Sequence, residues 1–205
     1  MHARILTLAA LVGASSVLFA CHKELSTPPI EEIVPLQVGN QWNYRVYRYN
    51  RQGVAYDSSA VITHTILRDT LIDRSTWYIL NTGLIVQNTT QGYAYYNVAG
   101  KEAVLIYPGA SQGSVGYGYQ YPNYLLNVYT VPNPQAAPVP NSRQKFVGYQ
   151  YSLQYTYTYP NLGTTQTQKR EDWVVPAVGP VRWDTYYLDS DVRQQRLELL
   201  SYTLK

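Results

Sequence analysis

The sequence predicts an all-β fold: about eleven antiparallel strands in a strongly curved open sheet or half-barrel, with a β-sandwich as the alternative. Three observations support this. Residues 147–159 alternate strictly between Tyr, Val or Leu at odd positions and Gly, Gln, Ser or Thr at even positions; this period indicates a strand and excludes a helix. Turn residues recur along the chain, and no properly capped helix is expected after residue 33. Tyrosine, with 22 copies against 2 Phe, favours strands.

The strands can be placed in order from apolar alternation and the turns between them. Trp42, Tyr44 and Val46 share one face of the first strand, and the turn at 50–53 leads to a partner rich in Thr, Val and Ile. Residues 69–74 are expected to interrupt the chain before the next strand. The expected strands cover residues 42–47, 58–68, 76–80, 84–87, 93–96, 103–107, 124–130, 147–159, 169–175, 181–189 and 195–204.

Two longer connections are expected to be loops. Residues 109–123 are rich in Gly, Tyr and Ser, and residues 131–142 contain four prolines. The strand at 147–159 would be about 43 Å long if straight, which is longer than most strands. We therefore expect a bend or bulge within it, at Gly148.

The N-terminus has the features of an export signal. Arg4 precedes an apolar run over residues 5–19, which is too short for a membrane span. The following Leu18-Phe19-Ala20-Cys21 resembles a bacterial lipobox, although Phe19 is larger than the residue usual at that position. The resemblance implies that residues 1–20 are a signal peptide and that Cys21 carries lipid. Residues 21–33 then form a Pro-containing tether, and residues 34–205 form a single β domain anchored to the outer membrane, on a face that the sequence leaves open.

Composition excludes several classes of function. Cys21 is the only cysteine, so a disulfide framework or a second thiol ligand is excluded. The net charge is +3, one unit of which comes from Arg4, and this does not indicate a nucleic-acid surface. No glycine-rich segment precedes a helix as a phosphate cradle would. We expect no cofactor.

The ionisable residues suggest little catalytic chemistry. His64 is the only histidine of the expected domain and has no partner at metal-ligand spacing, so a structural role is favoured. Asp69 with Asp73, and Asp189 with Asp191, flank turns and fit turn chemistry better than calcium binding. Carboxylates next to tryptophans could form a glycosidase site, but cross-strand pairing with arginine is favoured. The residues concerned are Glu171, Asp172 and Asp184, with Trp173, Trp183, Arg170 and Arg182.

The tyrosine stripe is the strongest candidate for a binding surface. Tyrosine suits a wide, partly hydrated interior, whereas a dry core prefers Leu, Ile and Phe. A core face remains an equal interpretation, because any half-buried strand alternates. The candidate ligand-binding residues are Tyr149, Tyr151, Tyr155, Tyr157, Tyr159, Trp173 and Trp183.

Several segments together resemble a family of predicted bacterial outer-membrane lipoproteins without assigned activity. They are Pro35-Leu36-x-Val38-Gly39-Asn40-x-Trp42-x-Tyr44, 69–78, Gly179-Pro180-Val181-x-Trp183 and 199–202. The resemblance implies a curved antiparallel sheet similar to that of lipoprotein carriers, whose concave face holds acyl chains. It implies no catalytic residues.

Three functions are therefore open. The first is a non-enzymatic outer-membrane lipoprotein that binds a hydrophobic or amphipathic ligand, or an envelope protein, on the Tyr-rich sheet. The second is a surface glycan-binding module, with Tyr117, Tyr119 and Tyr121 as further contacts. The third is a carboxylate-based hydrolase around Glu171, Asp172 and Asp184. The partners expected are the membrane, through the N-terminal lipid, and a lipid, glycan or envelope protein, but no nucleic acid.

Overall fold

A computed structural model describes residues 32–109 and 112–205. The expected signal peptide, Cys21 and nearly all of the tether lie outside the described residues. No helix in the described part is long and apolar enough to cross a membrane. Its only helical element is the 3-10 turn η1 (Pro160–Leu162).

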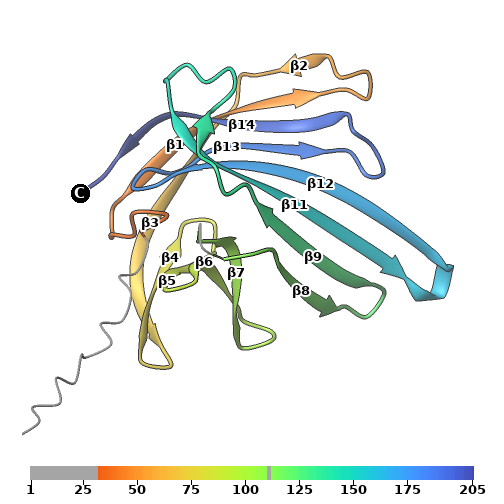
Figure 1. Ribbon diagram of the computed structural model, residues 1–205, viewed down its shortest axis with the longest axis horizontal. Coiled ribbons are helices and arrows are strands. Elements are labelled where there is room, and N and C mark those ends of the chain that lie inside the picture. Colours follow the sequence, from red (N-terminus) through yellow and green to blue (C-terminus); the bar gives the residue numbers. More distant parts are fainter. Residues whose placement is uncertain (1–31, 110–111) are drawn as a thin grey trace, which may run out of the picture.

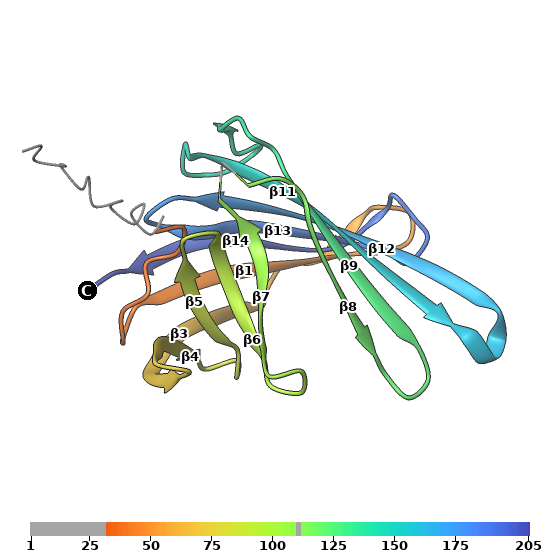
Figure 2. The ribbon, with the colours of Figure 1, turned by 60° about the horizontal axis from the view of Figure 1, so that its bottom comes forward.

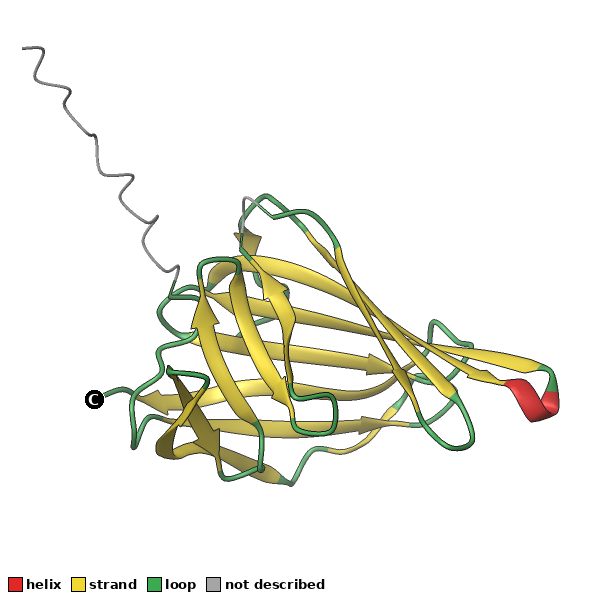
Figure 3. Cartoon of the chain, turned by 90° about the horizontal axis from the view of Figure 1, so that it is seen from below, coloured by secondary structure: helices red, strands yellow, loops and turns green. Residues whose placement is uncertain are grey.

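The described chain forms one antiparallel sheet that curves until it is nearly closed into a barrel (Figures 1 and 3). This confirms the predicted fold class. Fourteen strands are assigned within residues 32–109 and 112–205, three more than the eleven expected. They are β1 (Gln41–Tyr49), β2 (Ala55–Asp57), β3 (Val61–Ile72), β4 (Ser75–Leu80), β5 (Ile85–Thr89), β6 (Gly92–Asn97), β7 (Glu102–Pro108), β8 (Val115–Gln120), β9 (Leu125–Pro132), β10 (Ala137–Pro138), β11 (Val147–Tyr159), β12 (Thr164–Val175), β13 (Gly179–Tyr186) and β14 (Arg193–Thr203).

The topology joins two meanders through the first and last strands. The order is β7-β6-β5-β4-β3-β1-β14-β13-β12-β11-β9-β8, with the short β2 beside β1 and β10 beside β11. β7 and β8 are thus the two edges of the sheet, and curvature brings the β7 edge close to β8 and β9. The β11–β12 hairpin extends beyond the rest of the sheet, with the β8–β9 hairpin beside it (Figures 1 and 2).

Alternation along β1 sets the inner face of the sheet, the face that surrounds the interior. Trp42, Tyr44 and Val46 are all nearly fully buried, while the residues between them are partly exposed. The Tyr44 hydroxyl donates to the Pro180 carbonyl at 2.8 Å, and Trp42 Nε1 donates to the Val178 carbonyl at 2.6 Å. These bonds tie the first strand to the β12–β13 hairpin while satisfying the polar tips of buried rings.

The strand predicted at 147–159 is present with those bounds, but without a bulge. The pairings of β11 with β12 and with β9 run without a register shift. Gly148 has a different role: a Cβ there would lie 2.5 Å from the Val174 carbonyl oxygen. The glycine permits close approach of β12 where a bend was expected.

Two other local predictions were wrong. Residues 109–123 are not one loop, because β8 forms within them. Gly116 and Gly118 lie against the side chains of Tyr129 and Asn127 of β9, so the glycines face large neighbours instead of breaking the strand. The chain also does not break at residue 69. β3 runs on to Ile72 and turns at Asp73 and Arg74, whose φ values are 49° and 66°, as a two-residue hairpin requires.

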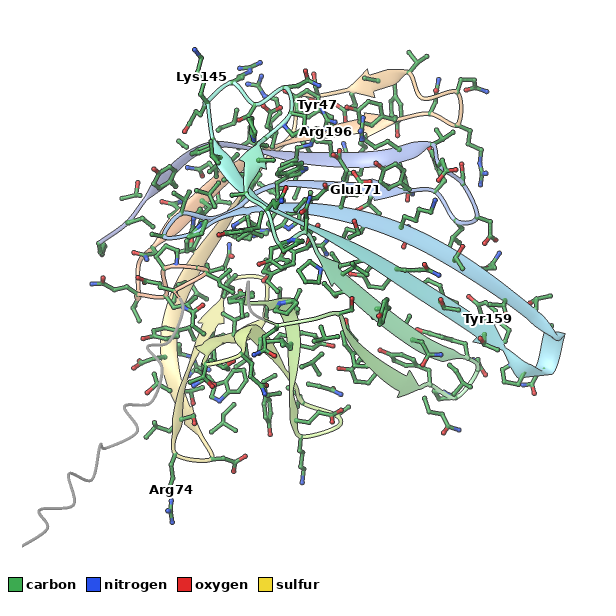
Figure 4. The ribbon with its side chains drawn as sticks, viewed as in Figure 1. Tyr47, Arg74, Lys145, Tyr159, Glu171 and Arg196 are labelled. Carbon is green, nitrogen blue, oxygen red and sulfur yellow. The ribbon has the colours of Figure 1, made fainter. Side chains whose placement is uncertain are left out.

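The loop between β9 and β11 covers the outer face of β13 and β14. Arg182 Nη1 donates to the Pro140 carbonyl at 2.6 Å, and Gln144 Nε2 donates to the Leu200 carbonyl at 3.2 Å. Val139 of this loop is buried in the hydrophobic core. Lys145 at its tip lies on the same side of the sheet as Arg196 (Figure 4). Within the four-proline segment 131–142, which was expected to be a loop, residues 131–132 end β9 and residues 137–138 form β10, while the rest packs as a loop against β13 and β14.

Candidate functional site

A cavity of about 310 Å³ lies inside the curved sheet, with walls from both meanders. Its lining is strongly aromatic, with eight tyrosines and two tryptophans. They are Tyr44, Tyr93, Tyr95, Tyr107, Tyr117, Tyr119, Tyr121, Tyr155, Trp42 and Trp183. Aliphatic side chains complete the walls, among them Leu80, Leu84, Val86, Ile106 and Leu126. The inner face is therefore a hollow with apolar walls and several hydroxyl groups.

Part of the cavity wall carries a charged network. Arg170 donates from Nε and Nη2 to the two carboxylate oxygens of Asp172, each at 2.7 Å. The Tyr107 hydroxyl donates to Asp172 Oδ2 at 2.8 Å, and it accepts from Trp183 Nε1 at 3.1 Å. The Asp172 side chain has no exposed surface, whereas that of Arg170 is 30% exposed. Arg170 therefore lines the cavity, whereas Asp172 does not.

Burial and hydrogen bonding act against each other at Asp172. Burial raises the pKa of the Asp172 carboxyl, while the charge and hydrogen bonds of Arg170 and the Tyr107 hydroxyl lower it. For Tyr107, burial raises the pKa well above its ordinary value, and the Asp172 charge adds to that rise. Tyr107 thus keeps its proton at neutral pH and acts as a donor.

His64 of β3 lies beside this network. Its ring is 5.2 Å from the Tyr44 ring and 5.4 Å from the Trp183 ring, measured between centroids. Burial lowers the His64 pKa, and the Arg170 charge lowers it further. The imidazole is therefore mostly neutral at neutral pH. The sequence favoured a structural role for His64; the structure places it in the cavity wall.

A chain of tyrosine rings runs from the cavity toward the extended hairpins. Tyr95 and Tyr119 share a hydroxyl–hydroxyl bond of 2.5 Å across the gap between β6 and β8. Ring contacts then lead from Tyr119 to Tyr121 and from Tyr121 to Tyr124, with centroids 6.4 and 4.6 Å apart. Tyr124 in turn contacts the ring of Tyr159, which lies near the far end of β11 (Figure 4). The aromatic surface is thus continuous over a long part of the inner face.

The predicted tyrosine stripe occupies one face, but its members have different surroundings. Tyr155 lines the cavity. Tyr151 is buried at 3% exposure, and its hydroxyl donates to the Pro108 carbonyl at 3.2 Å. Tyr149 packs against the hydrophobic core. Tyr157 and Tyr159 line a second hollow of about 350 Å³ near the hairpin tips. The stripe is thus part cavity wall and part core.

The two candidate tryptophans are separated by the sheet. Trp183 pairs with Asp172 in the β12–β13 register and lines the cavity. Trp173 is the next residue along β12 and so points to the outer face, where it is buried at 6% exposure. Trp173 is not among the cavity-lining residues.

The three carboxylates proposed for a hydrolase do not share one site. Asp172 lies on the inner face of the sheet, whereas Glu171 and Asp184 are register partners and lie together on the outer face. Arginines surround Asp184: Arg182 Nε donates at 2.6 Å and Arg196 Nε at 2.8 Å, with Arg193 Nε also 2.6 Å away. Pairing with arginine was expected across strands. Arg170–Asp172 and Arg182–Asp184 instead pair within a strand, at a spacing of two residues that places both on one face.

The described residues contain no group of three or more His, Cys, Asp or Glu arranged to hold a metal ion. Asp189 instead accepts from the Thr167 backbone N–H at 2.7 Å, as a turn residue does.

Sequence reasoning missed Tyr107, Tyr95 and the cavity position of Arg170. The sequence contained one signal for the Arg170–Asp172 pair: two residues that are two positions apart on a strand lie on the same face of the sheet.

Comparison with known proteins found structural similarity only. No family model matches the chain, and no curated protein matches its sequence. A Bacteroides fragilis protein described as exported, with a YmcC-like fold, is 10% identical over 85% of this chain and all of its own, with a TM-score of 0.47. A Parabacteroides distasonis protein described as a lipoprotein is 12% identical with the same coverage and a TM-score of 0.48.

Proposed function

We propose that the protein is a non-enzymatic lipoprotein of the cell envelope whose cavity holds a hydrophobic or amphipathic ligand. The observation that carries this proposal is the cavity of about 310 Å³ inside the sheet. Small-molecule sites commonly have about 300–1,000 Å³, with mostly apolar walls and a few polar groups. Here the walls are aromatic and aliphatic, and the polar groups gather around Arg170 and Tyr107.

The N-terminal signal supports a position at the outer membrane. Lipidation of Cys21 would keep the domain beside a supply of amphiphiles. Bacterial lipoproteins with a signal similar to this one carry three acyl chains, which would make the attachment permanent. A single acyl chain binds membranes only marginally. The length of the segment that follows Cys21 suits a tether that holds the domain close to the head groups.

Glycan binding has weaker support from the ring geometry. A sugar platform needs several coplanar exposed rings. Tyr121 and Tyr124 are stacked, with 21° between their planes, but Tyr119 is tilted by 56° from Tyr121 and Tyr157 by 53° from Tyr124. Along the row of tyrosines from Tyr119 to Tyr159, only Tyr121 and Tyr124 therefore form one flat surface.

Filling the cavity tests the proposal. Leu126 lines the cavity, while the adjacent Leu125 of β9 points to the other face. Leu126→Trp should therefore exclude ligand, and Leu125→Trp serves as the matched control with the same added volume. Both proteins would be extracted from membranes and compared with wild type by native mass spectrometry.

The expected result is a co-purifying amphiphile in wild type and in Leu125→Trp that is lost from Leu126→Trp. Absence of bound small molecules from wild type, together with failure to take up any added amphiphile, would refute the proposal. Binding on a glycan array with no retained amphiphile would favour the glycan-binding function instead.

A further inference from the structure

Arg170 is the one permanently charged side chain among the described residues that line the cavity. A cation in an apolar, aromatic hollow is costly to keep unless it is paired. Its partner Asp172 already receives two N–H groups from Arg170 and the hydroxyl of Tyr107. Since Asp172 has no exposed surface, it cannot meet a ligand.

The guanidinium retains hydrogen-bonding capacity toward the cavity. It has five N–H groups in a planar fork, and Asp172 takes two of them. The Tyr155 hydroxyl also contacts the Arg170 side chain, and the guanidinium lies over the Trp183 ring at 5.6 Å from its centroid. These contacts hold the fork in place, and such a fork matches the oxygens of a carboxylate or phosphate.

His64 adds a second nitrogen-bearing group on the same side. Both its ring and the Arg170 guanidinium contact the Trp183 ring, at 5.4 and 5.6 Å from the ring centroid, and both residues line the cavity. The other lining residues are aliphatic or aromatic, including Leu80, Val86 and Ile106. The cavity thus presents one guanidinium group, with the His64 imidazole nearby, within walls that are otherwise apolar apart from tyrosine hydroxyls.

We infer that the cavity selects amphiphiles with one anionic head group and one apolar chain, and that Arg170 binds the head group. This inference rests on the proposed function, because it requires that the cavity holds a ligand at all. A carboxylate or a phosphate monoester would suit the same fork, so the test includes both.

The experiment compares four probes with the same twelve-carbon tail: dodecanoate, dodecyl phosphate, dodecanol and dodecyltrimethylammonium. The full-length lipoprotein, purified from membranes in a non-ionic detergent, is titrated with each probe, and tryptophan fluorescence reports binding near Trp183. Each probe also partitions into detergent micelles, but to the same extent whichever protein variant is present. A difference between variants in the ratio of anionic-probe to neutral-probe affinity therefore reports on the cavity alone.

The test variant is Arg170→Met/Asp172→Asn, which removes both charges so that neither is left buried alone. Arg170→Gln is a second variant, which loses the charge but can still donate to Asp172. The matched control is Arg48→Met/Asp57→Asn, which removes an ion pair that lies on β1 and β2 and outside the cavity lining. Far-UV circular dichroism verifies that each variant is folded.

Wild type and the control should bind at least one anionic probe about tenfold or more tightly than dodecanol, as expected for a charge-assisted hydrogen bond. In either Arg170 variant that preference should fall to about twofold or less. Equal binding of anionic and neutral probes by wild type would overturn the inference while leaving the proposed function intact. If no probe binds wild type, or if Leu126→Trp does not weaken binding, the proposed function fails as well.

Discussion

Asp184→Asn tests the structural role of the charge cluster on the outer face. The Asp184 side chain has no exposed surface, and Arg182, Arg193 and Arg196 all approach its oxygens within 2.8 Å. The Arg182 and Arg196 side chains are only 7% and 13% exposed. Removing the anion with which all three arginines pair leaves them without that partner in a poorly hydrated site, which is the costly way to break a buried ion pair.

The expected loss of unfolding free energy is about 3–5 kcal/mol. For a domain of this size, each kcal/mol lowers the melting temperature by about 2–4 °C, so the midpoint should fall by roughly 6–20 °C. Denaturant titration and thermal melts measure both quantities. The variant should keep its antiparallel-sheet spectrum at low temperature if stability is the property that changes.

The matched control is Asp191→Asn. Asp191 also pairs with a cation, Lys169, but the two side chains are 86% and 57% exposed. An exposed pair contributes about 0–1 kcal/mol, so this variant should melt within a few degrees of wild type. If Asp184→Asn lost no more stability than Asp191→Asn, the reasoning about uncompensated buried arginines would be refuted.

Three further outcomes follow from the structure and from the predicted lipoprotein signal at Cys21. Gly148→Ala should lower the unfolding free energy by about 1–3 kcal/mol, because the new Cβ would meet the Val174 carbonyl at 2.5 Å; Gly113→Ala, with open space around it, should change it little in the same denaturant titration. Burial lowers the pKa of His64 in the folded state below its ordinary value of 6.5. As pH falls, the imidazole is therefore protonated in the unfolded chain before it is protonated in the folded chain, and the free energy of unfolding should fall as pH drops through about 6.5. His64→Phe should flatten that pH dependence, and an unchanged slope would contradict the assignment. Cys21→Ala should abolish labelling with radioactive palmitate and release the protein from membranes; unchanged labelling would overturn the lipid-anchor prediction.

Local periodicity explains the parts of the fold that sequence reasoning predicted well. The side-chain period of a strand is two, so the alternation at 147–159 was sufficient to place β11 and to assign its odd tyrosines to one face. The same pattern predicted the buried Trp42, Tyr44 and Val46 of β1.

Local patterns were misleading where a neighbour strand changes the role of a residue. Gly116 and Gly118 suggested a loop, yet they lie within β8 because large β9 side chains fill the space beside them. Gly148 suggested a bulge, yet its lack of a side chain serves contact with β12. In each case the role of the glycine depends on a neighbouring residue in another strand, and the pattern of residues along one strand contains no information about that neighbour.

The sequence by itself determined the all-β class, the strand faces and the prediction of a lipid-anchored export signal, because these depend on short-range spacing and composition. Only the tertiary structure decided which part of the inner face is hollow. Tyr151 and Tyr155 share a face, but the Pro108 end of β7 packs over Tyr151 and leaves Tyr155 beside the cavity. Likewise, parity put Arg170 and Asp172 together, while packing of Tyr107 against the carboxylate left the guanidinium facing the cavity. Curvature of the sheet brings these residues together from strands distant in sequence, so no local pattern contains that information.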